Sequence, residues 1–287
     1  MYPIVQRRVR VDAFGAPRWG RLAGAEVTLD DGRTIAESDA AFLAPVEPRT
    51  IFATHLSYRS RVEEYAARVP VEPSYFLKPA TTLNGHRGQL RRPAGTRFLN
   101  YEGEVAVVVG RRMHGLAQHE VLAHVAGYAC ANDVGLHDFR HADRGSMLRV
   151  KGQDGFCPIG PELVPASEFD PERFGLRTYL NGELVQEGGA GDLIWPISYL
   201  LADLNRLITL EPGDVLLSGT PAHSRPMEPG DVVEVEVDGL GRLANTVVDW
   251  DVDLAGPGVQ PEVSANTLHV ALAMPEDEAE RVAAGAA

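Results

Sequence analysis

Hydrophobic and polar positions alternate along the first part of the chain, and this alternation predicts β-strands. The segments VQRRVRVDAF and AEVTLDDGRTIAE both alternate, and an Asp-Gly pair interrupts the second, so we expect strands joined by tight turns. Pro45 and Pro48 then interrupt regular structure and predict a linker. A segment of this length is too short for a large core of its own. Residues 1–48 are therefore expected to form a small, β-rich accessory unit.

Helical spacing of apolar residues follows in two places. The segment YRSRVEEYAARV puts Tyr58, Val62 and Tyr65 on one face and predicts an amphipathic helix or lid. The segment WPISYLLADLNRL carries an apolar stripe at helical spacing, and Pro196 suits the first turn of that helix. The second of these segments is the clearest helix prediction in the chain.

Short apolar runs between glycine and proline turns predict further strands in the centre. The segment HEVLAHVAGYACAND begins like a helix and is expected to become a strand from Gly127 to Asp133. The runs VAVVVG, DVLLSG and DVVEVEVDG are also typical of strands. Residues 253–287 form an acidic, alanine-rich tail that we expect to end in a helix. The pattern predicts a β-rich α+β chain whose main domain covers residues 49–252.

Composition narrows the class of protein. The chain has 287 residues, 44% of them hydrophobic, which is enough for a large core, and a formal net charge of -13. Nucleic acid and anionic membrane surfaces are not expected as partners, because both require basic patches. No apolar run is long enough to cross a bilayer, and the N-terminus lacks the apolar centre of a signal peptide. With only Cys130 and Cys157, both in apolar segments, we expect a cytoplasmic protein with reduced thiols.

Two glutamates stand at the start of the apolar run LNYEGEVAVVVG. If residues 101–109 form a strand, Glu102 and Glu104 point to the same face. The valines predict a strand buried on both faces, where two like charges are poorly solvated unless a cation compensates them. Carboxylates suit hard cations such as Mg²⁺, Mn²⁺ or Ca²⁺, and Asp133 or Asp138 could supply a third. A solvated strand end and a turn-capping aspartate are the simpler alternatives.

An ordered set of motifs covers about residues 50–250. The set consists of FLKPATTLNG, LNYEGEVAVVVG, GYACANDVG, KGQDGFCPIGP, YLNGELVQEG and LEPGDVLLSGTP. Their order and spacing resemble those of the fumarylacetoacetate hydrolase family. The resemblance implies a mixed β-sandwich or roll of that family's C-terminal-domain type, built around one metal site and found mostly in homodimers.

The resemblance also assigns site residues. The metal ligands that it implies, for Mg²⁺ or Mn²⁺, are Glu102, Glu104 and Asp133. It places Lys151 beside the metal, and Gly219 and Thr220 as donors to a substrate carboxylate. A nearby cation disfavours an ammonium group, so we expect Lys151 to donate or accept a proton near neutral pH. A structural ion pair between Lys151 and Asp154 is the alternative.

The chain departs from the family in its lid segment. Many family members carry Asn-Tyr-x-x-His-x-x-Glu there, with the His and Glu as an acid–base pair. Here Tyr58 and Glu64 are kept, Ser57 replaces the asparagine, and Arg61 stands where the histidine is expected. Arginine is a poor general base but binds carboxylates in a bidentate way, so we expect Arg61 to hold the far carboxylate of a dicarboxylic substrate. His55 could replace the missing imidazole, and a solvated Arg61 is the simpler alternative.

A second departure is GLHDFR in place of the common SARDLQ, so we expect Gly135, His137 and Arg140 to alter substrate contacts. The lid resembles the branch that acts on 5-carboxymethyl-2-hydroxymuconate and 2-hydroxyhepta-2,4-diene-1,7-dioate in aromatic catabolism. The sequence thus predicts a metal-dependent ketonisation, with or without decarboxylation, of a 2-keto or 2-hydroxy-dienoic acid of the 2-hydroxymuconate type. One alternative is a carbon–carbon hydrolase of acylpyruvates in which His55 and Glu64 manage the water. The other is a ligand-binding protein that has lost turnover.

Overall fold

The computed structural model describes residues 4–143, 145–252 and 254–285. The predicted start of the N-terminal unit lies outside these ranges, and so do both predicted ends of the tail. The strands are β1 (Val9–Ala13), β2 (Ala16–Ala23), β3 (Glu26–Leu29), β4 (Thr34–Ala36), β5 (Ala41–Leu43), β6 (Ile51–His55), β7 (Ser74–Lys78), β8 (Leu83–Asn84), β9 (Gln89–Pro93), β10 (Leu99–Asn100), β11 (Gly103–Val109), β12 (Val125–Asn132), β13 (Gly135–Leu136), β14 (Cys157–Pro165), β15 (Gly175–Leu180), β16 (Glu183–Gly189), β17 (Val215–Leu217), β18 (Val232–Val237) and β19 (Gly241–Trp250). The helices are α1 (Arg59–Glu64), α2 (Gln118–Val121), α3 (Arg140–Asp143), α4 (Leu148–Lys151), α5 (Ile197–Asn205), α6 (Ala265–Leu272) and α7 (Glu276–Gly285), and a 3₁₀ turn, η4, covers His137–Phe139.

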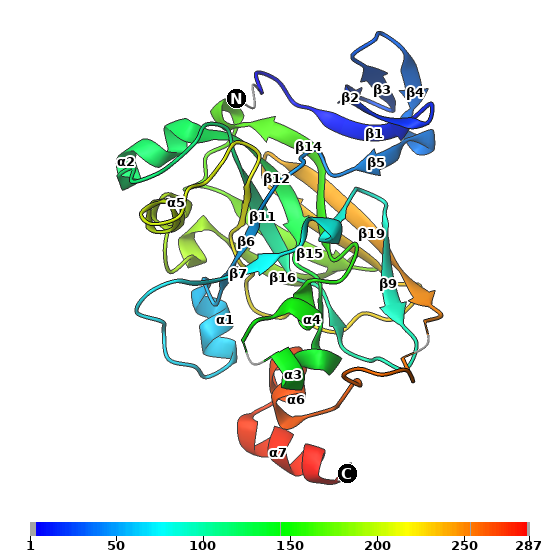
Figure 1. Ribbon diagram of the computed structural model, residues 1–287, viewed down its shortest axis with the longest axis vertical. Coiled ribbons are helices and arrows are strands. Elements are labelled where there is room, and N and C mark those ends of the chain that lie inside the picture. Colours follow the sequence, from blue (N-terminus) through cyan, green and yellow to red (C-terminus); the bar gives the residue numbers. More distant parts are fainter. Residues whose placement is uncertain (1–3, 144, 253, 286–287) are drawn as a thin grey trace.

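The N-terminal unit is a five-stranded antiparallel sheet in the order β4-β3-β2-β1-β5. Figure 1 shows this sheet at one end of the molecule. Val9 and Val11 of β1 are buried against Val27 and Leu29 of β3, so the alternation in the sequence corresponds to one inward face. The predicted β-rich character of this segment is confirmed.

The rest of the chain is built on two larger sheets. A seven-stranded mixed sheet in the order β7-β6-β17-β11-β12-β14-β8 curls into a half-barrel (Figure 1), and a five-stranded sheet in the order β16-β15-β18-β19-β9 packs against its strands β11, β12 and β14. The pairs β6–β17 and β8–β14 are parallel, and the others in the first sheet are antiparallel. The predicted β-rich α+β class with a mixed sandwich or roll is confirmed.

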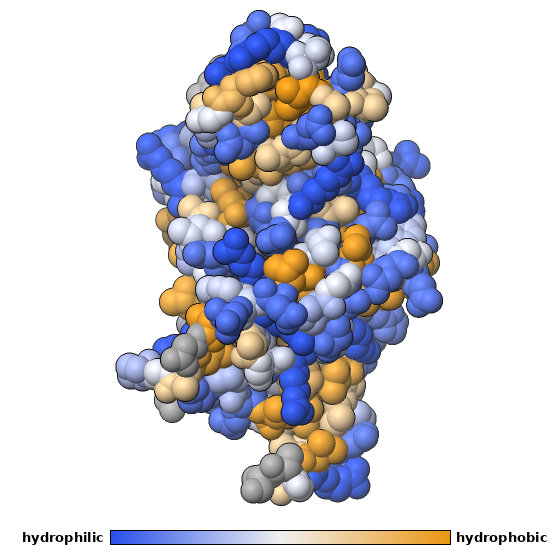
Figure 2. All heavy atoms as spheres, turned by 90° about the vertical axis from the view of Figure 1, so that its right-hand side faces the viewer, coloured by the Kyte–Doolittle hydropathy of each residue, from blue (hydrophilic) through white to orange (hydrophobic). Residues whose placement is uncertain are grey.

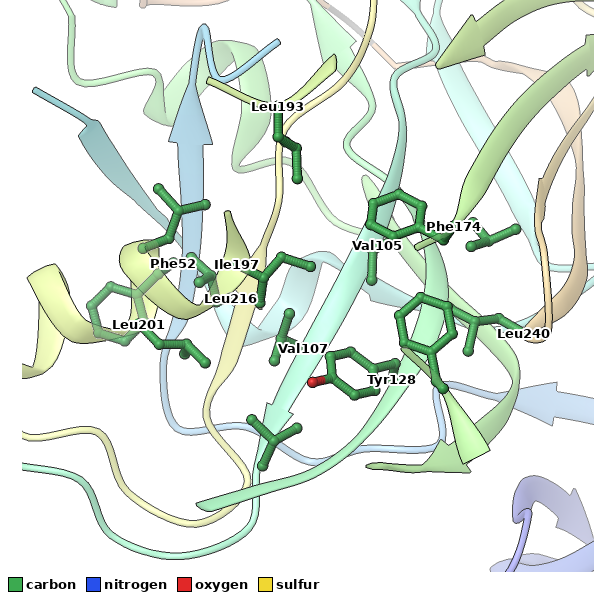
Figure 3. Close-up of a cluster of buried hydrophobic side chains, with 14 of the residues drawn as sticks. Phe52, Val105, Val107, Tyr128, Phe174, Leu193, Ile197, Leu201, Leu216 and Leu240 are labelled. Carbon is green, nitrogen blue, oxygen red and sulfur yellow. The ribbon is translucent and has the colours of Figure 1, made fainter. Parts of the chain in front are cut away.

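Strand β11 is at the centre of the core. All its residues are buried, as the run of valines predicted. Figure 3 shows Val105 and Val107 in one cluster with Ile197 and Leu201, which belong to the apolar stripe of α5. Val108 faces the other way, into a second cluster. A strand buried on both faces is held rigidly, and it therefore gives a fixed position to any side chain at its end.

Element boundaries differ from the predicted ones in three places. Helix α1 is shorter than its pattern suggested, and Tyr58 precedes it as the N-cap residue. Strand β12 begins before Gly127 and ends before Asp133. Gly127 lies within this strand and does not interrupt it. A Cβ at this position would lie 2.2 Å from the carbonyl oxygen of Val164, so the close packing of β14 against this strand requires glycine. Pro196 is the N-cap of α5 rather than part of its first turn.

The C-terminal segment folds onto the main domain as two helices, α6 and α7, rather than as a tail with one helix (Figure 1). Leu268 and Ala271 of α6 are buried against Phe98. The Asn100 side-chain amide donates to the Ala271 carbonyl at 2.9 Å. This docking brings a late part of the chain to the candidate site.

The face of the molecule in Figure 2 carries mainly hydrophilic residues, with hydrophobic ones interspersed among them. Within the described part of the chain, no helix combines the length and the apolar character needed to span a membrane. Cys130 and Cys157 are buried free thiols, as expected.

Candidate active site

Three carboxylates meet where β11 begins and β12 ends. Glu102 directly precedes β11, Glu104 is its second residue, and Asp133 directly follows the antiparallel neighbour β12. The Asp133 backbone N–H donates to the Glu102 carbonyl at 2.8 Å, which fixes the two chain segments together. One oxygen from each carboxylate lies within 4.8 Å of the others. The structure thus brings the three predicted metal ligands together.

The chemistry of this cluster fits a hard divalent cation. Glu104 and Asp133 are buried, and Glu102 is half-buried. Burial raises the pKa of Glu104 well above its ordinary value, and the charges of Asp133 and Glu102 raise it further. The Gly219 N–H donates to Glu104 Oε2 at 2.7 Å, but no described cationic side chain forms an ion pair with Glu104. Buried carboxylate oxygens without full compensation are the donors that Mg²⁺ and Mn²⁺ prefer.

Lys151 closes one side of the cluster. Its Nζ donates to Glu102 Oε2 at 2.7 Å and to the Asp133 carbonyl at 2.5 Å, and it lies 3.1 Å from Asp133 Oδ2. Its ion-pair partners are therefore these carboxylates and not Asp154. Burial lowers the pKa of Lys151, but Asp133 and Glu102 outweigh burial and raise it above the ordinary value. The expectation that the ammonium form is disfavoured depends on a cation bound by the three carboxylates, so it stays a prediction.

Lys78 is a site residue that the sequence analysis did not assign. This buried side chain donates to Asp133 Oδ1 at 2.5 Å and to the Lys151 carbonyl at 2.6 Å, so it holds both residues in place. A signal was present, because Lys78 and Lys151 are the only two lysines of the chain and both lie in family motifs.

A cavity of about 420 Å³ opens beside the cluster. Its lining includes nine predicted site residues: Glu102, Glu104, Asp133, Lys151, His55, Arg61, His137, Arg140 and Thr220. We call Glu102, Glu104, Asp133 and Lys151 the carboxylate wall. We call Arg61 of α1, His137 of η4, Arg140 of α3 and Asn266 of α6 the helix wall.

Four predicted site residues are not in the lining of this cavity: Tyr58, Glu64, Gly135 and Gly219. Gly219 has φ +86°, and a Cβ there would lie 1.9 Å from Ser57 Oγ, so glycine is required. Its N–H donates to Glu104, so in this structure it holds a candidate metal ligand. Its role toward a substrate, like that of Tyr58 and Glu64, stays a prediction.

Arg61 is already neutralised within the lid. Its Nη1 lies 2.7 Å from Glu64 Oε2, its Nη2 lies 3.7 Å from Glu102 Oε1, and its guanidinium covers the Tyr65 ring at 4.4 Å. Glu64 is in turn 2.7 Å from Arg225 Nη2 and accepts the His223 N–H. Burial raises the pKa of Glu64, but Arg61, Arg225 and this N–H together lower it below its ordinary value. Arg61 and Glu64 thus form an ion pair within the lid, and their roles toward a substrate stay predictions.

Two histidines line the cavity. His55 packs on the Phe76 ring with centroids 4.6 Å apart, and burial, with Lys151 and Arg140, lowers its pKa to about 4. It is therefore neutral at neutral pH and can accept a proton. His137 is 1% exposed, and neither of its ring nitrogens has a hydrogen-bond partner among the described residues.

Helix α6 supplies lining residues that the sequence analysis missed, namely Asn266, His269 and Val270. Ser264 caps this helix by accepting the Thr267 N–H, and this serine before an apolar run is the local signal for the helix. No local pattern shows, however, where the helix docks.

Comparisons with known proteins agree with this arrangement. Residues 50–248 match the family described as fumarylacetoacetate (FAA) hydrolase C-terminal. The 4-hydroxyphenylacetate degradation bifunctional isomerase/decarboxylase of Escherichia coli is 36% identical over 242 residues, which are 84% of this chain and 55% of that protein. The chain thus spans about half the length of this curated relative.

Two solved structures share the fold. The 5-carboxymethyl-2-hydroxymuconate delta-isomerase from Mycobacterium smegmatis has a TM-score of 0.76 and 32% identity, covering 86% of this chain and all of that one. The 2-hydroxyhepta-2,4-diene-1,7-dioate isomerase from Mycobacterium marinum has a TM-score of 0.75 and 30% identity, covering 85% of this chain and 98% of that one.

Proposed function

The chain belongs to the fumarylacetoacetate hydrolase family, and from this premise we propose that it is a divalent-metal-dependent isomerase. The proposed reaction is the ketonisation, with or without decarboxylation, of a 2-hydroxymuconate-type dicarboxylate. The observation that carries this proposal is the carboxylate cluster in the wall of a cavity large enough for a small dienoic acid. The activities named for the relatives support the substrate class. A homodimer and a cytoplasmic location remain predictions.

Glu102, Glu104 and Asp133 would hold Mg²⁺ or Mn²⁺. A cation bound there would supply Lewis acidity toward the 2-oxygen and the adjacent carboxylate of the substrate. Lys78 and Lys151 orient the ligands by their bonds to Asp133 and Glu102.

Ketonisation needs a proton to move and does not need water. In 2-hydroxyhepta-2,4-diene-1,7-dioate the 2-hydroxyl loses its proton, C5 gains one, and the double bonds shift to a 2-oxo-3-ene, so all atoms are conserved. Lys151 is the residue that we assign to holding or moving this proton, because its buried Nζ lies in the cavity wall between Glu102 and Asp133. Thr220, which also lines the cavity, would hydrogen-bond the substrate carboxylate.

A carbon–carbon hydrolase of acylpyruvates is the second candidate, and one observation favours it. His55 lines the cavity, where its neutral ring could take a proton from water, although burial lowers its pKa to about 4 and makes it a weaker base than a free histidine. Its expected partner Glu64 is outside the cavity lining and is bound to Arg61 and Arg225. This engagement of Glu64 makes the isomerase our first choice.

The experiment that tests the proposal is incubation with 2-hydroxyhepta-2,4-diene-1,7-dioate and with 5-carboxymethyl-2-hydroxymuconate, with and without Mg²⁺. Ultraviolet absorbance and product mass are followed together. A metal-dependent spectral change at constant mass is the expected result, and loss of CO₂ identifies the decarboxylase form. Gain of water would establish the hydrolase instead. No change with these compounds or with acylpyruvates would reject both enzymes in favour of a ligand-binding protein.

A further inference from the structure

Arg140 differs from the other cationic groups in the cavity lining. Lys151 and Arg61 each form ion pairs with carboxylates, whereas no described carboxylate lies within ion-pair distance of Arg140. Its contacts are with Asn266 Oδ1, 3.3 Å from Nε, and with Met147 Sδ, 3.7 Å from Nη1. A half-buried guanidinium with free donors in a cavity wall is suited to a planar carboxylate.

His137 gives independent support for a polar ligand at this wall. It is almost fully buried, it lines the same cavity, and both of its ring nitrogens lack a hydrogen-bond partner among the described residues. A buried polar group without a partner costs free energy, so an atom of a ligand is expected to satisfy it. Residues three apart lie on one side of a helical turn, which places His137 near Arg140.

The C-terminal segment holds these groups in position. Thr267 Oγ1 donates to the His137 carbonyl at 3.2 Å, and the Glu262 N–H donates to the Asp138 carbonyl at 2.8 Å. Asn266, exposed at the edge of the cavity, accepts from Arg140. All three bonds come from residues beyond 248, where the family match ends. This wall of the cavity is thus partly built by a part of the chain outside the family match.

We propose that Arg140, oriented by Asn266, binds the substrate carboxylate that is remote from the metal, and that His137 hydrogen-bonds the same end of the substrate. The inference deepens the proposed function and rests on it. It assigns to Arg140 the role that the sequence analysis gave to Arg61, because Glu64 already neutralises Arg61. Helix α6 then acts as a specificity element for dicarboxylates.

The test compares 2-hydroxyhepta-2,4-diene-1,7-dioate with 2-hydroxyhepta-2,4-dienoate, which lacks the second carboxylate. Arg140→Gln should raise KM for the dioate by about 10- to 100-fold, which corresponds to the loss of charge-assisted hydrogen bonds. Its kcat on the dioate and its kinetics on the monocarboxylate should change little. Asn266→Asp should raise KM for the dioate by about tenfold, because the new carboxylate competes for Arg140.

Arg281→Gln is the matched control, because it removes an exposed cation of the same C-terminal segment outside the cavity. It should leave KM and kcat unchanged for both substrates. Equal losses on the two substrates, or no loss on the dioate, would overturn the inference. If Arg140→Gln does not fold, the Asn266→Asp comparison decides in the same way.

A binding measurement separates this inference from the proposed function. Calorimetry with heptanedioate and heptanoate, neither of which can be isomerised, should show a preference of the wild type for the diacid that Arg140→Gln loses. If the wild type shows this preference but turns over neither of the two dienoic acids, the isomerase proposal would be rejected and the carboxylate-binding role of Arg140 would be supported. Equal binding of the diacid by both proteins would reject the subsite.

Discussion

The carboxylate wall and the helix wall of the cavity are built in different ways. Glu104 and Asp133 sit at the ends of central strands, buried, and inside the region that matches the family. Arg140 and Asn266 sit on short helices that are partly exposed, and Asn266 lies beyond the family match. We infer from this difference that the strands hold the groups for metal-assisted chemistry in fixed positions, whereas the helices determine which substrate binds.

Glu104→Gln tests the role of the carboxylate wall and should have the largest effect on activity. Gln keeps an acceptor for the Gly219 N–H but removes the charge of a candidate metal ligand, so kcat/KM should fall by about 10³-fold or more, while thermal unfolding changes little. Steady-state kinetics and a melting curve measure the two effects. Glu187→Gln, at an exposed position on β16, is the control and should be silent. Retained activity would show that the metal-site assignment is wrong.

Lys78→Met tests the support beneath the carboxylate wall. It removes a buried cation from Asp133 and a donor from the Lys151 carbonyl, so the free energy of unfolding should fall by about 3–5 kcal/mol. Denaturant unfolding measures the loss, with Arg91→Met at an exposed position of β9 as the control. An unchanged unfolding midpoint would mean that Lys78 is not needed to hold the cluster.

His55→Ala separates the two enzyme classes. An isomerase that uses Lys151 should lose less than about tenfold in kcat, whereas a hydrolase that uses His55 as its base should lose about 10²- to 10⁴-fold. Single-turnover kinetics on the substrate identified above give the answer. A severe loss of kcat would assign the proton transfer to His55 instead of to Lys151 of the carboxylate wall.

The smallest effect is expected in the lid. The folded-state pKa of Glu64 is lower than its ordinary value, so its ion pairs add stability above the unfolded pKa, and this stability is lost as pH falls through the folded pKa. The difference in unfolding free energy between wild type and Glu64→Gln should therefore be full at neutral pH and shrink in acid. Denaturant titrations over this pH range test the point. A difference that is constant with pH would show that the charge of Glu64 contributes nothing.

The two walls also differ in how much of each could be predicted from the sequence. The period of a strand puts Glu102 and Glu104 on one face, and the valines beside them predict burial, so this cluster was predictable from local pattern and motif. Lys78 was missed because its contact with Asp133 joins residues that are far apart in the chain. Asn266 was missed because a helix pattern says nothing about docking, which depends here on the apolar contact of Leu268 with Phe98.

Metal titration tests the central claim most directly. The chelator-treated wild type is titrated with Mn²⁺ by calorimetry, and ketonisation activity is measured at each point. We expect about one bound ion per chain, activity that rises in proportion to occupancy, and no binding by Glu104→Gln. Full activity of the chelated protein, or Mn²⁺ binding that Glu104→Gln leaves intact, would contradict the account.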